Sequence, residues 1–436
     1  MVPKIDRRQF IGLSVGAGAT VAVAVALSSG NGGGTSAPSA TSSTAVTTGT
    51  STGSTLPSAT TVPSKTSSLG DLQFGGRRLV VVQLNGGNDL LNTLPPTQGR
   101  YHDMRPTLAL GDNEVLSLSG IDDAGLHPSL APLLPAWDAG QLALIRGIGF
   151  EVPNRSHFVS MDRWWRADQL TKPGWLGRVV DGLADEPSPL FGTALGASAP
   201  LLSGATRQPT VIGSSGSFRW VDIDPEWIAA LSGPDDNGTD LADQARHAFL
   251  RTVQAVDDFA EITGGEPTSD QLAGREGGAS IAGGLATAAQ LLASDAGAQL
   301  VVVSASGFDT HADQLPVQAN LLTDLGEGVA TFMAAMESAG LADDVLLVVT
   351  SEFGRRVAEN GSGGCDHGAG GFSMAIGSAV KGGMYGEVDL DDLLDGDVRP
   401  VVAPQALFTN CLDWLGVDAE ATLGERDDSL GLLRTG

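Results

Sequence analysis

The 436-residue chain carries 25 lysines and arginines against 51 aspartates and glutamates, which gives a formal net charge of −26 at pH 7. Such an acidic surface repels nucleic acid and anionic lipid, so the composition argues against a nucleic-acid-binding protein. An anionic substrate would need a locally positive site, such as a bound metal. Hydrophobic residues make up 42% of the chain, enough for the core of one large domain or two ordinary ones.

The first residues have the pattern of an export signal. Arg7 and Arg8 precede an uncharged, mildly apolar stretch over 11–27, which is short for a membrane span of about 20 strongly apolar residues. Small residues at 24–26 offer a cleavage site, so we predict a twin-arginine signal peptide over 1–26, with an uncleaved membrane anchor as the alternative. We then expect export by the twin-arginine translocase and no stable membrane insertion after cleavage. The expected location is secreted, periplasmic or associated with the cell wall.

Residues 27–75 are expected to form a disordered Ser/Thr/Gly-rich linker. From 28 to 70 the chain is almost wholly Ser, Thr, Gly, Ala and Pro, with Lys65 as its only charge. Such a segment buries too little apolar area to offset its conformational entropy. Order is expected to begin near Arg77, and residues 76–436 are expected to form one α/β domain.

Short apolar runs predict buried β-strands, and helical patterns lie between them. Because the runs are apolar on both faces, they are typical of a parallel sheet. Strands that alternate with helices predict an α/β fold with stacked layers. The predicted strands are 79–84, 141–148, 300–303 and 345–349, and the predicted helices are 239–262, 280–296 and the one that carries the stripe Leu322, Leu325, Val329, Phe332 and Met336.

Polar residues directly follow three of the predicted strands, which is where ligands bind in such folds. Asp89 follows the first strand, Asp309 and His311 follow the third, and Glu352 and then His367 follow the fourth. In a parallel sheet these loops meet at one edge. Carboxylate oxygen and imidazole nitrogen suit zinc, manganese or a similar divalent ion, which acts as a Lewis acid. The alternative is that Asp309 and His311 cap the helix that follows.

A second candidate site lies at 154–158, after the predicted strand 141–148. Ser156 is expected at the start of a helix, where free backbone N–H groups stabilise an oxyanion or a phosphate, so it is the candidate nucleophile. The alternative is an ordinary serine N-cap. Arg155 and Arg355 are the candidates to bind substrate oxyanions, because a guanidinium presents a fork suited to phosphate.

The two cysteines and His127 have less distinctive surroundings. Cys365 and Cys411 either form one disulfide or stay as two buried thiols, since folding before export takes place in a reducing compartment. His127 is expected to begin a helix and to be structural.

Eight short motifs occur in the order found in one bacterial protein family. They are 84–89 (LNGGND), Tyr101 with 105–106 (RP), 126–128 (LHP), 155–158 (RSHF), 174–178 (GWLGR), 307–311 (GFDTH), 351–355 (SEFGR) and 366–368 (DHG). From about residue 77 to 420 the chain resembles the family called domain of unknown function 1501. That family is usually grouped with the alkaline phosphatase and sulfatase superfamily. The resemblance therefore implies an alkaline-phosphatase-like, three-layer α/β/α sandwich with a mainly parallel central sheet.

The resemblance also implies roles for individual residues. Asp89 matches the superfamily's aspartate after the first strand, and Ser156 is the best candidate for its nucleophile position. Asp309 and His311 match the aspartate and histidine of one metal site, with His367 as its second histidine.

The chain departs from the superfamily in the loop after the fourth strand. Glu352 stands where the superfamily has an aspartate, and Phe353 stands in place of an imidazole ligand. Neither Cys365 nor Cys411 lies in the Cys-x-Pro-x-Arg sequence of formylglycine sulfatases, which disfavours a sulfatase of that kind. We therefore expect one metal, or a tight site with a weak second one.

Two functional hypotheses follow from these patterns. The first is an exported, metal-dependent hydrolase that acts on a phosphate ester or related anionic ester, in a small molecule or a polymer. Its divalent metal would be zinc, manganese or calcium. The second is a non-catalytic relative that binds an extracellular polymer or a partner protein, which the missing imidazole at Phe353 and the Ser/Thr-rich linker favour.

Overall fold

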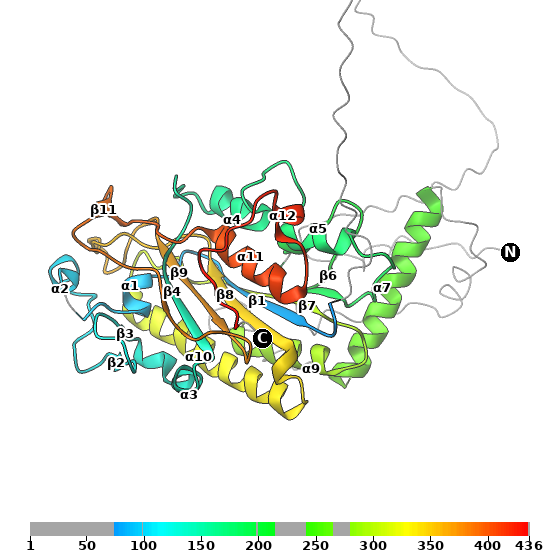
Figure 1. The fold of residues 1–436 in the computed structure, drawn as a ribbon, viewed down its shortest axis with the longest axis horizontal. Helices are drawn as coiled ribbons and strands as arrows, with labels where there is room; N and C mark the ends of the chain where they lie inside the picture. Colours follow the sequence, from blue (N-terminus) through cyan, green and yellow to red (C-terminus); the bar gives the residue numbers. More distant parts are fainter. Residues whose placement is uncertain (1–73, 98, 198, 214–240, 265–279, 435–436) are drawn as a thin grey trace, which may run out of the picture.

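The computed structural model describes residues 74–97, 99–197, 199–213, 241–264 and 280–434 (Figure 1). The predicted signal peptide and all of the predicted linker except residues 74–75 lie outside these ranges. None of the helices within them is long and apolar enough to cross a membrane.

The described residues form an eight-stranded sheet in the order β10-β4-β9-β8-β1-β7-β5-β6 (Figure 1). β9 pairs antiparallel with β4 and β8, and the other neighbouring strands of this sheet pair parallel. The predicted mainly parallel sheet is therefore confirmed. Its strands are β1 (Arg78–Leu84), β4 (Leu142–Ile148), β5 (Gly192–Leu195), β6 (Thr210–Ile212), β7 (Leu300–Ala305), β8 (Val345–Ser351), β9 (Gly371–Ile376) and β10 (Gly383–Tyr385).

Alternating side chains of the central strands enter two separate hydrophobic cores. In β1, Val80 and Val82 belong to the core on one face, while Leu79 and Val81 belong to the core on the other. Every residue of β4, β7 and β8 is buried. This two-sided burial is why all four strands predicted from continuous apolar runs are present.

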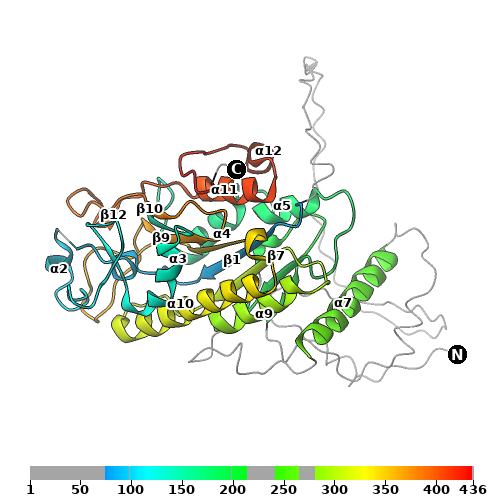
Figure 2. The ribbon, with the colours of Figure 1, turned by 60° about the horizontal axis from the view of Figure 1, so that its bottom comes forward.

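Helices cover both faces of the sheet, which confirms the three-layer α/β/α sandwich (Figures 1 and 2). One face carries α1 (Leu90–Thr93), α3 (Leu134–Asp138), α9 (Ile281–Ala293) and α10 (Gln314–Ser338), and the other carries α4 (His157–Arg166), α5 (Trp175–Asp181), α11 (Pro404–Leu415) and α12 (Ala419–Leu423).

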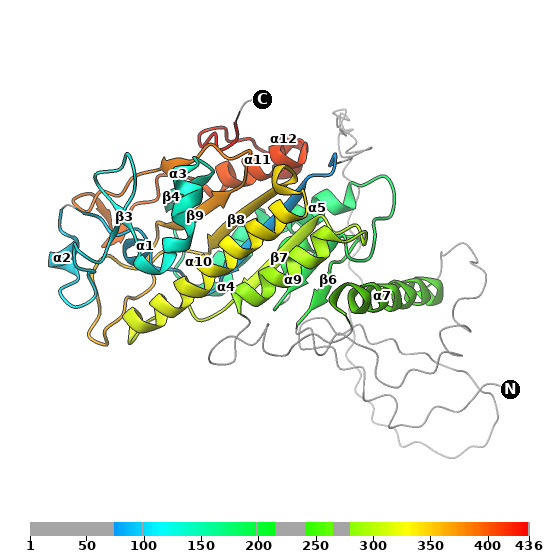
Figure 3. The same ribbon diagram turned by 90° about the horizontal axis from the view of Figure 1, so that it is seen from below.

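The predicted helices are present on the first of these faces. All five residues of the predicted apolar stripe in α10 are buried. α7 (Leu241–Thr263) lies at the β6 end of the sheet (Figure 3) and buries Ala255 and Phe259 in the same core as α9. Residues 239–240 of the predicted helix lie outside the described ranges.

Smaller elements connect these layers. They are α2 (Tyr101–Met104), the 3-10 helices η1 (Pro128–Leu133), η2 (Pro200–Leu202) and η4 (Ala342–Asp344), and the strand pairs β2 (Leu116–Ser117) with β3 (Gly125–Leu126) and β11 (Leu393–Leu394) with β12 (Asp397–Val398). Within the described ranges, Cys365 and Cys411 are buried free thiols, so the second alternative for the cysteines holds.

His127 caps η1 with a neutral imidazole, as its predicted structural role requires. Its Nδ1 accepts a hydrogen bond from the backbone N–H of Ser129 at 3.1 Å, and the residue is 4% exposed. Burial lowers the pKa of His127 to about 4, against a smaller opposing effect of Glu114.

This cap makes folding stability depend on pH. Because the pKa of His127 is lower in the folded chain than the value of about 6.5 expected when it is unfolded, the unfolded chain binds the proton more tightly. The contribution of neutral His127 is complete above pH 6.5 and is lost as the pH falls toward 4, at a cost of about 3 kcal/mol. In His127→Asn we expect this part of the loss of folding stability at acidic pH to disappear. Urea unfolding at several pH values measures it, and parallel curves for the two proteins would refute the assignment.

Candidate metal centre

The candidate site is built from four loops at one edge of the sheet. His157 follows β4, Asp309 and His311 follow β7, and Glu352 follows β8. His367 precedes β9, and because β9 runs antiparallel, the segment before it lies at the same edge as the segments after the parallel strands.

Three imidazoles approach the carboxylate of Asp309. The Nε2 atoms of His311 and His367 each lie 3.0 Å from Oδ1 of Asp309, and the two Nε2 atoms are 2.9 Å apart. Nε2 of His157 lies 3.4 Å from Oδ2 of the same aspartate. The ligand atoms of His157, Asp309 and His367 all lie within 4.8 Å of one another.

The other nitrogen of each imidazole is hydrogen-bonded to an oxygen. Carbonyl and carboxylate oxygens only accept hydrogen bonds, so each Nδ1 carries the proton and each Nε2 presents a lone pair. The pairs are His157 with Oε1 of Glu352 at 2.7 Å, His311 with Oδ1 of Asp366 at 3.1 Å, and His367 with the carbonyl oxygen of Arg155 at 2.8 Å.

This arrangement fits a divalent cation. The Nε2 atoms of His311 and His367 lie 2.9 Å apart, a distance that two lone pairs tolerate only when a proton or a metal ion is shared between them. Nε2 of His157 is buried and has no hydrogen-bond partner in the part of the chain that the structure describes. A tetrahedral ion with bonds of about 2.0–2.1 Å holds its ligand atoms about 3.3 Å apart, close to the spacing found here.

Asp309 is held in its ionised form. Burial alone would raise its pKa, but the hydrogen bond and the positive charge of Arg355 lower the pKa of Asp309, which is about 2. The hydrogen bond to Glu352 raises the pKa of His157 above its usual value, which makes its Nε2 a stronger ligand.

Arg355 is buried behind Asp309. Its guanidinium donates to Oδ1 of Asp309 at 2.7 Å, to the carbonyl oxygens of Gly87, Phe308 and Cys365 at 2.7–2.9 Å, and to that of Gly86. The residue is 1% exposed, so it does not contact a substrate in solution. The predicted oxyanion-binding guanidinium is thus placed against Asp309 and backbone carbonyl oxygens instead of facing solvent.

The glycine-rich loop after β1 packs directly against this set. Gly86 has φ +123°, and a Cβ there would lie 2.3 Å from the backbone nitrogen of Asp309. Gly87 has φ +77°, and a Cβ there would lie 2.3 Å from the ring of Phe353. That ring lies with its centroid 4.9 Å from the centroids of both His157 and His367, so Phe353 forms an apolar wall beside two ligands.

Glu352 and Asp89 do not join the converging atoms. Glu352 contacts this group only through His157, because its Oε1 accepts hydrogen bonds from Nδ1 of His157 and from the backbone N–H of Gly86. Asp89 caps α1 and forms a buried ion pair with Arg105 at 2.5 Å. Glu352 and Asp89, both predicted as ligands, therefore bind neighbouring protein groups: Glu352 orients His157, and Asp89 pairs with Arg105.

The helix α4 carries His157, and Ser156 is its N-cap, as predicted. The Ser156 hydroxyl makes no capping hydrogen bond within the described ranges. The guanidinium of Arg155 is bound to Asp397 at 2.7 Å and Asp395 at 3.0 Å. The guanidinium that was predicted to bind substrate oxyanions is therefore paired with two carboxylates of the protein. The carbonyl oxygen of Arg155 orients His367.

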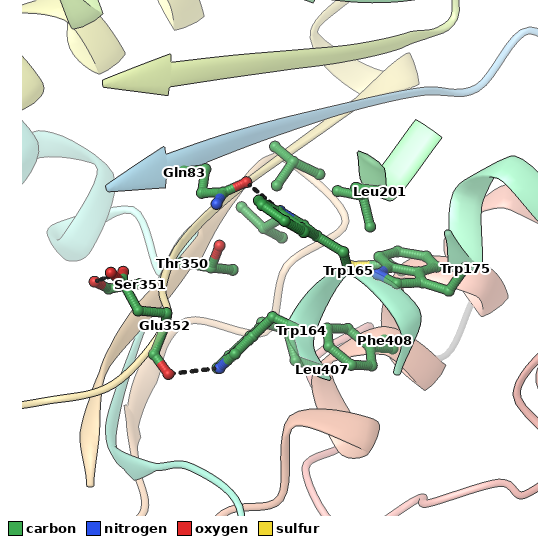
Figure 4. A pocket seen from close by; sticks show the side chains of 13 residues that line it. Gln83, Trp164, Trp165, Trp175, Leu201, Thr350, Ser351, Glu352, Leu407 and Phe408 are labelled. Carbon is green, nitrogen blue, oxygen red and sulfur yellow. Dashed lines mark hydrogen bonds between the residues drawn. The ribbon is translucent and has the colours of Figure 1, made fainter. Parts of the chain in front are cut away.

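Tryptophans anchor α4 over the sheet (Figure 4). Nε1 of Trp164 donates to the carbonyl oxygen of Glu352 at 3.0 Å, and Nε1 of Trp165 donates to Oε1 of Gln83 at 3.0 Å. A pocket between α4 and the strands β1 and β8 is lined by these residues. The anchor fixes the start of α4, and with it His157, relative to the strand ends.

His157 is the member of this histidine–aspartate group that the sequence interpretation did not name. It stands in the Arg-Ser-His-Phe motif, directly after Ser156. The signal that identifies it is its place after β4, because the carboxyl end of that strand lies at the same edge as those of β7 and β8.

The comparisons with known proteins agree with the ordered motifs. The sequence model of the family described as "protein of unknown function (DUF1501)" matches residues 122–432. The chain belongs to the DUF1501 family. The resemblance inferred from the motifs is confirmed, although the motifs at 84–89 and at 101–106 precede the matched range.

The DUF1501 chain is also similar to solved structures. One is a protein in the alkaline phosphatase superfamily from Vibrio parahaemolyticus, with TM-score 0.40 and 9% identity, over 82% of this chain and 71% of that one. A second is the alkaline phosphatase of the Antarctic bacterium TAB5, with TM-score 0.38 and 14% identity, over 78% and 98%. A third is the lipoteichoic acid synthase LtaP from Listeria monocytogenes, with TM-score 0.35 and 10% identity, over 79% and 72%. No curated protein matches the DUF1501 chain.

The contact between Gly86 and Asp309 yields a prediction about the centre. Gly86→Ala forces a strained φ and a Cβ against the backbone of Asp309, so we expect a loss of about 2–4 kcal/mol of stability. Zinc affinity, measured by chelator competition, should fall about 10-fold or more, because Asp309 shifts. The matched control is Gly340→Ala, which has φ +71° and no described atom within 4 Å of its Cβ. It should lose about 1–2 kcal/mol and keep its zinc affinity. Equal zinc affinities in both variants would contradict the role of this contact.

Proposed function

We propose that this protein is an exported, metal-dependent hydrolase of phosphate esters or related anionic esters. The observation that carries the proposal is the approach of three imidazole Nε2 atoms to within 3.0–3.4 Å of the ionised carboxylate of Asp309. Export by the twin-arginine route is part of the proposal and rests on Arg7, Arg8 and the apolar stretch after them.

His157, Asp309, His311 and His367 are the proposed ligands. A divalent ion held there supplies Lewis acidity toward a phosphoryl oxygen and a positive charge that attracts an anionic substrate. The imidazole-rich set favours zinc over calcium, which takes oxygen ligands. This local positive charge would offset the repulsion between an anionic substrate and a chain of net charge −26.

Ser156 is the proposed nucleophile. It precedes the proposed ligand His157 directly and is the N-cap of α4, and the first backbone N–H groups of a helix can bind an anion. Its Oγ attacks phosphorus, the ester oxygen leaves as an alcohol, and water then cleaves the phosphoserine and restores the hydroxyl. Arg155 contributes through its carbonyl oxygen, which holds the His367 ring in place.

The test combines metal content with hydrolysis of phosphate monoesters and diesters. Elemental mass spectrometry of the purified mature protein should find bound zinc or manganese, and removal of the metal with a chelator should abolish hydrolysis. His157→Ala and His367→Ala should lose metal and activity together. His102→Ala is the matched control, because His102 is an exposed histidine paired with Asp112, and it should retain both.

Ser156→Ala separates binding from chemistry. It should keep its metal and lose about 10²-fold or more in kcat, since the covalent route is closed. An intact wild type that holds no metal, or one that holds metal and hydrolyses no anionic ester, would contradict the proposal. The second result would favour the non-catalytic binding protein instead.

A further inference from the structure

The charged groups around the centre indicate how many ions it holds. We propose that the centre binds one divalent ion per chain, and that Glu352 is a positioning residue that acts on this ion through His157. The inference deepens the proposed function and rests on it, because it concerns the same centre.

The carboxylate of Asp89 is fully occupied. Its Oδ1 accepts from the backbone N–H of Leu91 and from Arg105, and its Oδ2 accepts from Arg105 and Gln314. Asp89 is 1% exposed and Arg105 is fully buried. To ligate an ion, Asp89 would have to leave a buried guanidinium without its counter-charge, which is strongly unfavourable.

Arg355 occupies the position beside Oδ1 of Asp309 that a second ion would need in order to bind the same carboxylate oxygen. Its Nη2 lies 2.7 Å from Oδ1, the same oxygen that His311 and His367 approach. Hydrogen bonds to carbonyl oxygens of three separate loops fix the guanidinium in this place. Its positive charge already offsets part of the negative charge of Asp309, which leaves less negative charge to hold a second cation. Arg355 therefore supplies fixed charge that a second metal ion would otherwise supply.

Glu352 is committed to its protein partners. Oε1 accepts from Nδ1 of His157 and from the backbone N–H of Gly86, while Oε2 accepts from the hydroxyl of Ser351 at 3.2 Å. The residue is 4% exposed. Its effect on an ion passes through the imidazole: it fixes the Nδ1–H tautomer and turns Nε2 toward Asp309.

The test counts ions and compares their coordination. Metal-free protein is titrated with Zn²⁺ by calorimetry and with Co²⁺ as a probe whose visible absorption reports the ligand set. We expect one equivalent in the wild type. Glu352→Ala should bind one equivalent about 10–100-fold more weakly. Glu352→Gln should bind closer to wild type, because its amide oxygen still accepts from Nδ1 of His157. Both variants should keep the wild-type Co²⁺ spectrum, whereas His157→Ala should change it.

Asp413→Asn controls for the loss of a carboxylate, since Asp413 is paired with Arg426 on the surface, and it should titrate as wild type. A second equivalent bound by the wild type would overturn the inference, and so would a Glu352→Gln spectrum altered in the same way as that of His157→Ala. A wild type that binds no ion overturns both this inference and the proposed function. One bound ion without hydrolysis supports the inference and contradicts only the proposed function.

Discussion

The buried guanidinium of Arg355 holds together the loops from which the centre is built. It donates hydrogen bonds to carbonyl oxygens of the loop after β1, the loop after β7 and the segment before β9. It also donates to Oδ1 of Asp309. Few other side chains could do this, because a guanidinium presents several donors in one rigid plane and accepts nothing. The tight approach of Gly86 to the Asp309 backbone completes the contact between the first two loops.

A buried ion pair between Arg105 and Asp89 also supports this region and contacts the loop after β8. Arg105 also donates to the carbonyl oxygens of Arg356 and Val357. Removing one partner of such a fully buried pair costs about 3–5 kcal/mol. Arg105 thus neutralises Asp89, whereas Asp309 accepts a hydrogen bond from Arg355 and still lies within 3.4 Å of three imidazole nitrogens, which is the set proposed to hold a cation. The chemistry of the centre follows from this division between supporting and converging groups.

The sequence predicted the elements whose signals are local. Continuous apolar runs identify β1, β4, β7 and β8, and the apolar stripe identifies α10. The insertion of antiparallel β9 between β4 and β8 depends on pairing between distant segments, which no local pattern records. The same limit explains the differences between the predicted and observed surroundings of the site residues. Charged residues are usually exposed, so the burial of Arg355 is visible only once three distant loops are placed around it. Asp309, His311 and His367 were predicted because they follow or precede strands, whereas placing His157 beside them required knowing that β4 ends at the same edge.

The central claim is that three imidazoles and one carboxylate oxygen bind a single divalent ion. X-ray absorption at the zinc edge of the zinc-loaded protein tests it most directly, because scattering from imidazole rings counts the histidine ligands. The account predicts three imidazoles and oxygen at distances of about 2.0–2.2 Å. A zinc ion surrounded by oxygen with one imidazole or none would contradict it.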